Sequence, residues 1–246
     1  MKNKNILLLG HKGMLGHMVK KYFEFKKQNI KTCDHRWPTN NLKKYILESN
    51  FDFIINCIGA IPQRKTEFSV NYELPIWLDK NTSCNIIHQG TDSEDNNEYS
   101  KSKQKAIDYI FNHGQNTKIL KTAIIGPELS SKASLLEWFL SQENEVDGYS
   151  KAIWSGNTTL EWAKHCYNLI SDWDKYKLQT TLQGETISKY DLLKNISNVW
   201  GKKIKINKVQ KGIDRSLIGD IKTSNIKTQL LELKNLLNEN NGRHTP

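Results

Sequence analysis

The sequence predicts an α/β protein with a doubly wound parallel sheet of the Rossmann type, followed by a smaller α+β region. Short apolar segments alternate with longer segments whose apolar residues recur at helical spacing, and a glycine-rich turn follows the first apolar segment. Continuously apolar strands are typical of a parallel sheet that is covered on both faces. Because parallel strands need crossover connections, their alternation with helices indicates βαβ units.

Five strands separated by helices are expected in the first half of the chain. The first strand, residues 6–10, reads ILLLG, and the helix after it carries an apolar stripe from Met14 to Phe23. The later apolar runs are short and end at Gly, Asn or polar residues, as buried strands usually do. We expect strands at 29–33, 51–60, 85–90 and 118–126, and helices at 39–49, 66–82 and 98–112. These elements form a first domain over residues 1–126.

The alternation of strands and helices weakens after Gly126-Pro127. Thr158 and Glu161 form a capping box, which predicts the start of a helix that runs to Leu169. We expect further helices at 134–142, near 188–199 and within 223–239, and strands at 149–156 and 203–209. Residues 127–246 thus form a smaller second region, and we expect part of 149–183 to pack back on the first domain.

Composition argues against several classes of protein. The formal charge is +10, but only four of the 36 basic residues are Arg and the lysines are scattered, whereas nucleic-acid recognition favours clustered guanidinium groups. An anionic small molecule would still benefit from the positive field. No run of 18 apolar residues and no signal-peptide cleavage site is found, so we expect a cytoplasmic protein without a membrane partner. Four cysteines without a C-x-x-C pair indicate neither disulfides nor a structural metal.

The turn from Gly10 to Gly16, GHKGMLG, is the clearest candidate binding site. Its pattern, G-x-x-G-x-x-G, lets the backbone turn tightly, approach a pyrophosphate and pack the helix against the sheet, while the helix N-terminus adds a positive dipole. A glycine-rich turn without a ligand is the alternative, but dinucleotide binding requires this setting of strand, motif and helix. We expect a dinucleotide cofactor to contact Gly10, Lys12, Gly13, Met14, Leu15 and Gly16.

The end of the second strand carries conflicting signals about that cofactor. Asp34 could accept hydrogen bonds from the adenosine ribose hydroxyls of NAD. Arg36, together with Lys12, could instead hold the 2′-phosphate of NADP. We favour NADP and keep NAD as the alternative.

A Y-x-x-x-K spacing occurs three times, at Tyr22/Lys26, Tyr99/Lys103 and Tyr190/Lys194, where chance alone gives about one match. This spacing places both side chains on one helix face, so the lysine ammonium can lower the pKa of the phenol. Ligands of such sheets lie at the carboxyl ends of the strands, and only Tyr99/Lys103 follows a strand there. Thr91, at the end of the preceding strand, could share the substrate carbonyl oxygen.

Several motifs occur in the order found in the extended short-chain dehydrogenases/reductases. They are GHKGMLGHM, IINCIGAI, Asn71 in NYELP, Thr91-Asp92, YSKSK and ILKTAIIGPEL. The chain resembles most closely the branch of the dTDP-4-dehydrorhamnose reductases and related nucleotide-sugar reductases. The resemblance covers most of the chain and weakens in the second half.

The resemblance implies NAD(P)H-dependent reduction of a keto group on a nucleotide-activated 6-deoxy sugar, for surface polysaccharide synthesis. It assigns the pyrophosphate to Gly10, Gly13 and Gly16, the nicotinamide side to Cys57, Ile58 and Gly59, and catalysis to Thr91, Tyr99 and Lys103. An epimerase on the same scaffold and a non-catalytic, cofactor-binding regulatory subunit are the alternatives.

Three departures from the family pattern concern the substrate side. Tyr99 follows Thr91 after only eight positions, because the loop that commonly comes between them is largely missing. The substrate site is then more open, or a partner completes it in a homodimer. Gly90 stands where the family often has Ser, and Lys121 stands where Arg is common.

The second region, 127–246, is expected to bind the nucleotide sugar through 127–157 and the segment after 183. Aromatic and cationic side chains suit bases and phosphates, so Trp154, Asn157 and Arg215 are the candidate substrate contacts. A plain core position is an equally good interpretation of Trp154.

Overall fold

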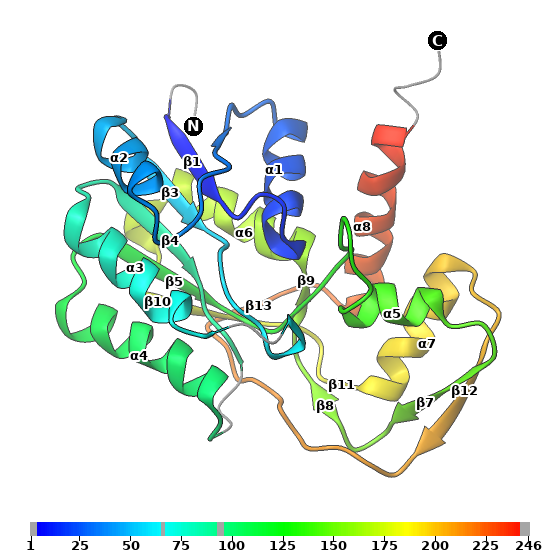
Figure 1. Ribbon diagram of the computed structural model, residues 1–246. Coiled ribbons are helices and arrows are strands. Elements are labelled where there is room, and N and C mark those ends of the chain that lie inside the picture. Colours follow the sequence, from blue (N-terminus) through cyan, green and yellow to red (C-terminus); the bar gives the residue numbers. More distant parts are fainter. Residues whose placement is uncertain (1–3, 65–66, 93–95, 242–246) are drawn as a thin grey trace. The chain divides into compact units, whose positions relative to one another are not determined.

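The computed structural model describes residues 4–64, 67–92 and 96–241 (Figure 1). The chain divides into two compact units, each described separately below. The first comprises Met1–Lys121 and Ala163–Thr180, and the second comprises Thr122–Trp162 and Thr181–Pro246. The sequence-based boundary at residue 126 falls slightly later than this division, and the segment that returns to the first unit lies within the expected range 149–183.

The first unit is built on a parallel sheet, which confirms the predicted fold class. Its strands pair in parallel in the order β5-β4-β3-β1-β2, and β10 extends the sheet beside β5. The strands are β1 (Ile6–Leu9), β2 (Lys31–Thr32), β3 (Phe53–Asn56), β4 (Asn85–Gln89), β5 (Thr117–Lys121) and β10 (Gln179–Gln183). β1 and β3 are buried at every position, as strands covered on both faces must be.

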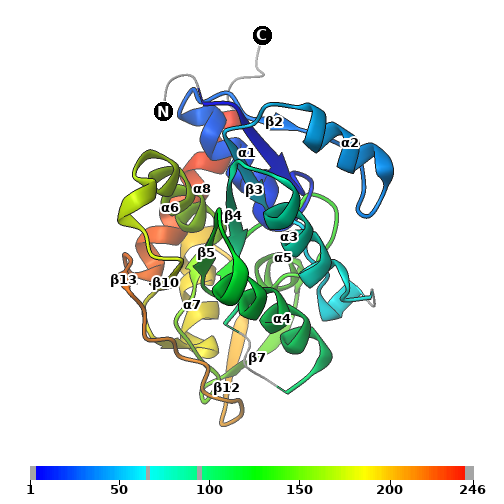
Figure 2. The same ribbon diagram turned by 90° about the vertical axis from the view of Figure 1, so that its left-hand side faces the viewer.

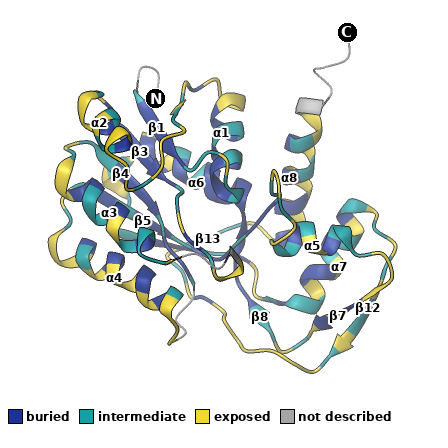
Figure 3. Ribbon diagram, in the orientation of Figure 1, coloured by how far each residue is buried: buried dark blue, intermediate teal, exposed yellow. Residues whose placement is uncertain are grey.

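Helices cover both faces of this sheet (Figure 1, Figure 2). They are α1 (Met14–Phe25), α2 (Asn40–Glu48), α3 (Val70–Asn81), α4 (Glu98–His113) and α6 (Thr159–Ser171). On one face, α2 and α3 bury Leu42 and Leu74 against the strands, and α4 packs beside α3. On the other face, Tyr22 and Phe23 of α1 contact the ring of Tyr167. In Figure 3 β1 and β3 are accordingly dark blue, and the helices turn their yellow faces to solvent.

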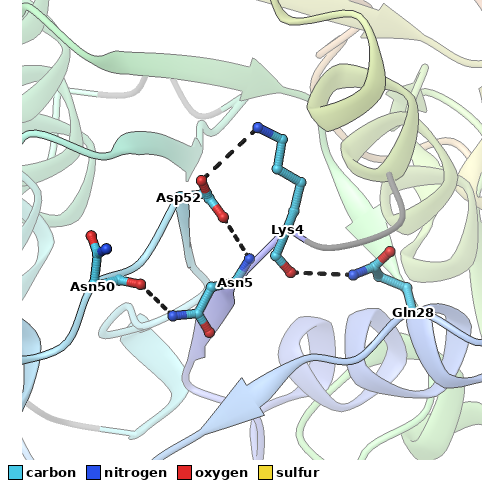
Figure 4. Close-up of polar contacts among 5 residues, drawn as sticks. All are labelled: Lys4, Asn5, Gln28, Asn50 and Asp52. Carbon is cyan, nitrogen blue, oxygen red and sulfur yellow. Dashed lines mark hydrogen bonds and ion pairs between the residues drawn. The ribbon is translucent and has the colours of Figure 1, made fainter.

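The amino end of β1 is fixed by side chains of its neighbours (Figure 4). The backbone N–H of Asn5 donates to the carboxylate of Asp52 at 2.7 Å, and the Asn5 amide donates to the carbonyl of Asn50. From the other side, Gln28 donates to the carbonyl of Lys4 at 3.4 Å. These bonds hold the start of β1 beside β3, so the glycine turn at its other end has a fixed starting point.

In its described residues, the second unit combines short strands with three helices of its own. The helices are α5 (Leu135–Ser141), α7 (Lys189–Trp200) and α8 (Ile226–Asn241). The strands are β6 (Ile124–Ile125), β7 (Glu145–Tyr149), β8 (Ile153–Trp154), β9 (Asn157–Thr158), β11 (Ile187–Ser188), β12 (Lys205–Val209) and β13 (Ile221–Lys222). The longest pairing is the parallel one between β7 and β12, on which α7 packs.

Most of the expected elements are present, with a few differences. The capping box is confirmed, because the backbone N–H of Glu161 donates to the hydroxyl of Thr158 at 3.1 Å. The expected strand 118–126 is interrupted between Lys121 and Ile124 and becomes β5 and β6. The sequence did not predict five of the strands, because most of them are too short to show a periodic pattern. They are β7, β9, β10, β11 and β13.

Candidate active site

The glycine turn lies against the end of β3. Gly10 has a φ of +79°, which favours glycine, and a side chain there would press on the backbone of Cys57 and Ile58 at about 3 Å. A Cβ at Gly16 would overlap the carbonyl oxygen of Gly10. Both glycines are therefore required by the close approach of backbone to backbone.

The first turn of α1 is open to an anion. Gly13 occupies the N-cap and has no side chain to cap the helix, and the first turn holds no acidic residue. The N–H groups that begin a helix need an acceptor, and the helix dipole favours a negative one. A pyrophosphate fits these requirements, as the sequence predicted.

A charged cluster marks the end of β2. Lys12 Nζ lies 2.6 Å from a carboxylate oxygen of Asp34, and His11 Nε2 lies 3.6 Å from it. Hydrogen bonding to Lys12 lowers the pKa of Asp34. Arg36 is exposed two residues further on. Unpaired, the negative charge of Asp34 would repel a 2′-phosphate. The ion pair with Lys12 offsets that charge.

The segment from Cys57 to Ala60 is held by four hydrogen bonds with three partner residues. The N–H of Cys57 donates to the carbonyl of Leu9 at 3.1 Å, and the N–H of Ile58 donates to Asn56 Oδ1 at 3.1 Å. Asn71 accepts from the N–H of Ala60 at 2.7 Å and donates to its carbonyl at 3.1 Å. The segment is thus a rigid wall that touches the glycine turn through Gly10.

Tyr99 and Lys103 lie on α4 as predicted, with Thr91 opposite. The Tyr99 hydroxyl donates to Thr91 Oγ1 at 3.4 Å, and the Tyr99 ring packs edge-on against Phe68. Lys103 is almost fully buried and donates to the carbonyl of Gln89 at 3.3 Å. A Cβ on Gly59 would lie 3.4 Å from the Lys103 ammonium, so the lysine reaches the Cys57–Ala60 wall.

Burial controls the ionisation of this pair. It raises the pKa of Tyr99, and Asp92 adds to the rise while the hydrogen bond to Thr91 opposes it. The expected lowering of the Tyr99 pKa by the lysine is wrong for the protein alone, because desolvation is the largest cause of the shift and raises the pKa. Burial also lowers the pKa of Lys103 to about 8. Tyr99 therefore stays in its protonated, proton-donating form at neutral pH.

The other two Tyr/Lys pairs have a different geometry. Lys26 Nζ lies over the ring of Tyr22, 5.7 Å from its centroid, and Lys194 Nζ lies over the ring of Tyr190 at 5.4 Å. In both pairs the ammonium lies over the ring face, the arrangement of a cation–π interaction. Tyr22 is moreover buried against Tyr167.

The glycine at position 90, where the resemblance led us to expect a serine, has a structural reason. A Cβ at Gly90 would lie 2.9 Å from a methyl of Ile119 and 3.0 Å from the Cα of Lys121. Any side chain there would displace β5. In the short connection between Thr91 and Tyr99, positions 93–95 lie outside the described residues.

Of the three candidate substrate contacts, two are interior residues of the second unit. Trp154 is buried, with the ammonium of Lys189 over its ring. Asn157 is fully buried, and its amide donates to Thr122 and the carbonyl of Leu182 while accepting from Thr223 and Gln229. Arg215 is exposed, and its backbone N–H donates to the carbonyl of Ile153. Asn157 thus has a complete set of internal partners.

The sequence analysis did not find a cavity of about 760 Å³ in the second unit. The cavity lies among α5, β7 and α7 and includes two partly exposed aromatic side chains, Trp138 and Tyr149. Its other lining residues include Leu135, Asp147, Lys189 and Asn207. The sequence spacing of Trp138 and Tyr149 does not predict that they line one cavity, because α5 and β7 are brought together only by the tertiary structure.

The chain is similar in structure to several known nucleotide-sugar enzymes. A dTDP-4-dehydrorhamnose reductase from Clostridium acetobutylicum matches with a TM-score of 0.75 and 19% identity, over 95% of this chain and 99% of the other. The same enzyme from Bacillus anthracis, in complex with NADP, matches with a TM-score of 0.78 and 11% identity, over 95% and 98%. A UDP-N-acetylglucosamine 4-epimerase from Bacillus cereus matches with a TM-score of 0.71 and 15% identity, over 96% and 100%.

The chain has the fold of these nucleotide-sugar enzymes. The predicted resemblance is confirmed at the level of the fold, over nearly the whole chain. No protein-family model and no curated protein matches the sequence itself. None of the helices in the described residues has the length and apolar composition needed to cross a membrane.

Proposed function

We propose that the protein reduces a keto group on a nucleotide-activated 6-deoxy sugar with NADPH, in the manner of a dTDP-4-dehydrorhamnose reductase of surface polysaccharide synthesis. The observation that carries this proposal is the arrangement of Thr91, Tyr99 and Lys103 next to the wall Cys57–Ala60. Among the three Tyr/Lys pairs, this one combines a phenol hydrogen-bonded to a threonine with a buried lysine, and it does so on the unit that carries the glycine turn.

The residues present fit a dinucleotide. Gly10 and Gly16 leave space that a Cβ would fill, and the uncapped start of α1 offers N–H donors to the pyrophosphate. Lys12 and Arg36 would hold the 2′-phosphate of NADP, and Asp34 would take the ribose of NAD if Lys12 released it. When bound, the cofactor supplies the hydride.

The chain's own groups would handle the proton and the charge. Tyr99 donates its phenolic proton to the oxygen that becomes a hydroxyl, and its raised pKa keeps that proton available. Thr91 lies within hydrogen-bond reach of Tyr99 and shares the same oxygen. Lys103 stabilises the tyrosinate that is left behind.

For the substrate nucleotide, the cavity of the second unit is a better candidate than Trp154 or Asn157. Trp138 and Tyr149 are partly exposed and suit stacking on a base, and Lys189 suits a phosphate. Trp138→Ala should weaken dTDP binding about tenfold, the loss of one base stacking contact. Phe111→Ala, at an exposed position on the outer helix α4, is the matched control and should leave dTDP binding unchanged. Equal affinity in both variants would remove the cavity from the substrate site.

The test of the function is an absorbance assay. The protein is incubated with NADPH and a panel of 4-keto-6-deoxy nucleotide sugars, and loss of absorbance at the nicotinamide band reports reduction. Tyr99→Phe is run in parallel as the inactive reference. If the protein binds neither NADPH nor NADH, the enzymatic proposal is refuted as a whole.

An epimerase is the second candidate, supported by the structural match to a UDP-N-acetylglucosamine 4-epimerase. Such an enzyme returns the hydride to its substrate. The returned hydride is one that the bound oxidised dinucleotide, NAD, first takes from the same sugar. The enzyme would therefore interconvert two nucleotide sugars with no net change in the dinucleotide, which chromatography of the products detects. Binding of NADPH with neither activity would instead favour the regulatory subunit.

A further inference from the structure

A buried pair of polar side chains lies behind the proposed site and has no role in it so far. Asn56, at the end of β3, and His88, in β4, are direct neighbours across the two strands. Asn56 is 0% and His88 is 1% exposed. Their side chains meet at 3.2 Å, between Asn56 Nδ2 and His88 Nδ1. Polar groups buried this deeply are costly unless each is satisfied, so the pair needs an explanation.

The direction of the hydrogen bonds follows from the contact to Ile58. Asn56 Oδ1 accepts from the N–H of Ile58 at 3.1 Å, so Nδ2 of the same amide is the donor toward the ring. His88 Nδ1 must then accept, and the proton of the neutral ring sits on Nε2. Burial lowers the pKa of His88 well below its usual value, and the positive charge of the nearby Lys103 lowers it further. The ring therefore stays neutral.

His88 Nε2 itself has no partner among the described residues. An unpaired buried N–H destabilises the folded state, and a leucine of similar size would avoid that cost. The one polar contact recorded for the ring in the described part of the chain is the one to Asn56. The imidazole is therefore placed to hold the Asn56 amide in one orientation.

We infer that His88 is a positioning residue, which acts through Asn56 to fix the backbone of Ile58 and Gly59 at the wall beside Lys103. The inference rests on the proposed function, in which this wall lines the cofactor. Of the contacts that hold the wall, those of Cys57 and Ala60 come from Leu9 and Asn71. The N–H of Ile58 is held by the side-chain amide of Asn56, which could rotate by half a turn and exchange its oxygen and nitrogen. His88 Nδ1 prevents this rotation by accepting a hydrogen bond from Asn56 Nδ2.

The consequence of losing His88 follows from that geometry. Without an acceptor for Nδ2, the Asn56 amide loses one of the two bonds that fix its orientation. Any rotation in which Nδ2 seeks another acceptor moves Oδ1 away from the N–H of Ile58 and breaks that bond. The wall then shifts relative to Gly10 and Lys103. Both lie near it, because a Cβ at Gly10 would meet the backbone of Cys57 and Ile58 at about 3 Å and a Cβ at Gly59 would lie 3.4 Å from the Lys103 ammonium. Misplacement of this kind affects turnover more than folding.

The test compares three variants, each purified and shown to be folded, by their kcat and melting temperature. His88→Leu removes the acceptor, His88→Gln keeps an acceptor oxygen, and Ile86→Val is the matched control, since Ile86 lies on the same face of β4 and pairs with Ile54. His88→Leu should lower kcat between about tenfold and a hundredfold. His88→Gln should recover most of that loss, and Ile86→Val should lower the melting temperature slightly without changing kcat.

Hydrogen exchange of the Ile58 amide gives a readout that does not depend on turnover. It should quicken about fivefold in His88→Leu, the equivalent of one lost hydrogen bond of about 1 kcal/mol, and stay unchanged in Ile86→Val. If His88→Leu does not fold, His88→Met takes its place. Wild-type kcat and unchanged Ile58 exchange in a folded acceptor-free variant would overturn the inference. If the wild type binds NADPH but reduces no sugar, the proposed function fails, and the Ile58 exchange still decides the role of His88.

Discussion

α4 and α7 carry the same Y-x-x-x-K spacing in different surroundings. On α4, Lys103 is almost fully buried and bonds to the carbonyl of Gln89, while Tyr99 bonds to Thr91. On α7, the ammonium of Lys194 rests on the ring of Tyr190 at the surface. The spacing fixes only that the two side chains share a helix face. Burial and the position of the ammonium decide whether a pair can act on a substrate oxygen.

The largest effect is expected from Tyr99→Phe. This change removes the proton donor and keeps the ring that packs on Phe68, so turnover should fall by about 10²–10⁴-fold with folding and NADPH binding retained. Tyr22→Phe and Tyr190→Phe should leave the rate within experimental error of the wild type. Turnover by Tyr99→Phe at the wild-type rate would remove the distinction between α4 and the other two helices.

Lys103→Met should separate activity from stability. The pKa of Lys103 falls from 10.5 to about 8 on folding, so the buried charge destabilises the folded state below pH 8, and this cost is relieved as the pH rises toward 10.5. The shift corresponds to about 3 kcal/mol at most. Lys103→Met should therefore lose turnover but unfold at a higher denaturant concentration below pH 8, with the difference shrinking above it.

Lys194→Met is the control for this prediction. Because Lys194 is exposed, its replacement should change the free energy of unfolding by less than about 0.5 kcal/mol at every pH. Denaturant titrations at several pH values compare the two variants. A stability difference for Lys103→Met that is no larger than that of Lys194→Met would show that burial does not distinguish the lysines.

The same contrast between the units extends to their glycines. Gly16→Ala should weaken NADPH binding at least about tenfold, since the new Cβ overlaps the Gly10 carbonyl and forces the turn open. Gly201, at the end of α7, has a φ of +68° but no atom within 4 Å of a Cβ. Gly201→Ala should cost about 1 kcal/mol of stability and leave NADPH affinity unchanged. Fluorescence titration with NADPH and thermal unfolding measure the two effects.

The smallest expected effect concerns two exposed arginines. Arg36→Ala should weaken NADP binding about tenfold, the value of one charge-assisted hydrogen bond, and leave NAD binding unchanged. Arg215→Ala, in the second unit, should affect neither dinucleotide. Calorimetric titration with both dinucleotides checks this, and unchanged NADP affinity in Arg36→Ala would leave only Lys12 for the 2′-phosphate.

Much of the first unit was predictable from the sequence alone. Buried parallel strands such as β1 and β3 are continuously apolar. The glycines of the turn after β1 are needed where its backbone packs closely against other backbone. The capping box at Thr158 is likewise a local pattern with a local consequence. These features depend on residues close together in the chain, so their physics is readable from a short stretch of sequence.

Other properties depend on residues far apart in the sequence, and only the tertiary structure decided them. Desolvation of Tyr99 by its surroundings reversed the expected direction of its pKa. The contact between Asn56 and His88 joins two residues 32 positions apart on neighbouring strands, and no pattern in either strand predicts it. Asn157 has the polarity of a ligand contact, yet its four hydrogen bonds run to the interior of its own unit. A side chain's chemistry is set by what surrounds it, and the sequence specifies those surroundings only through the fold.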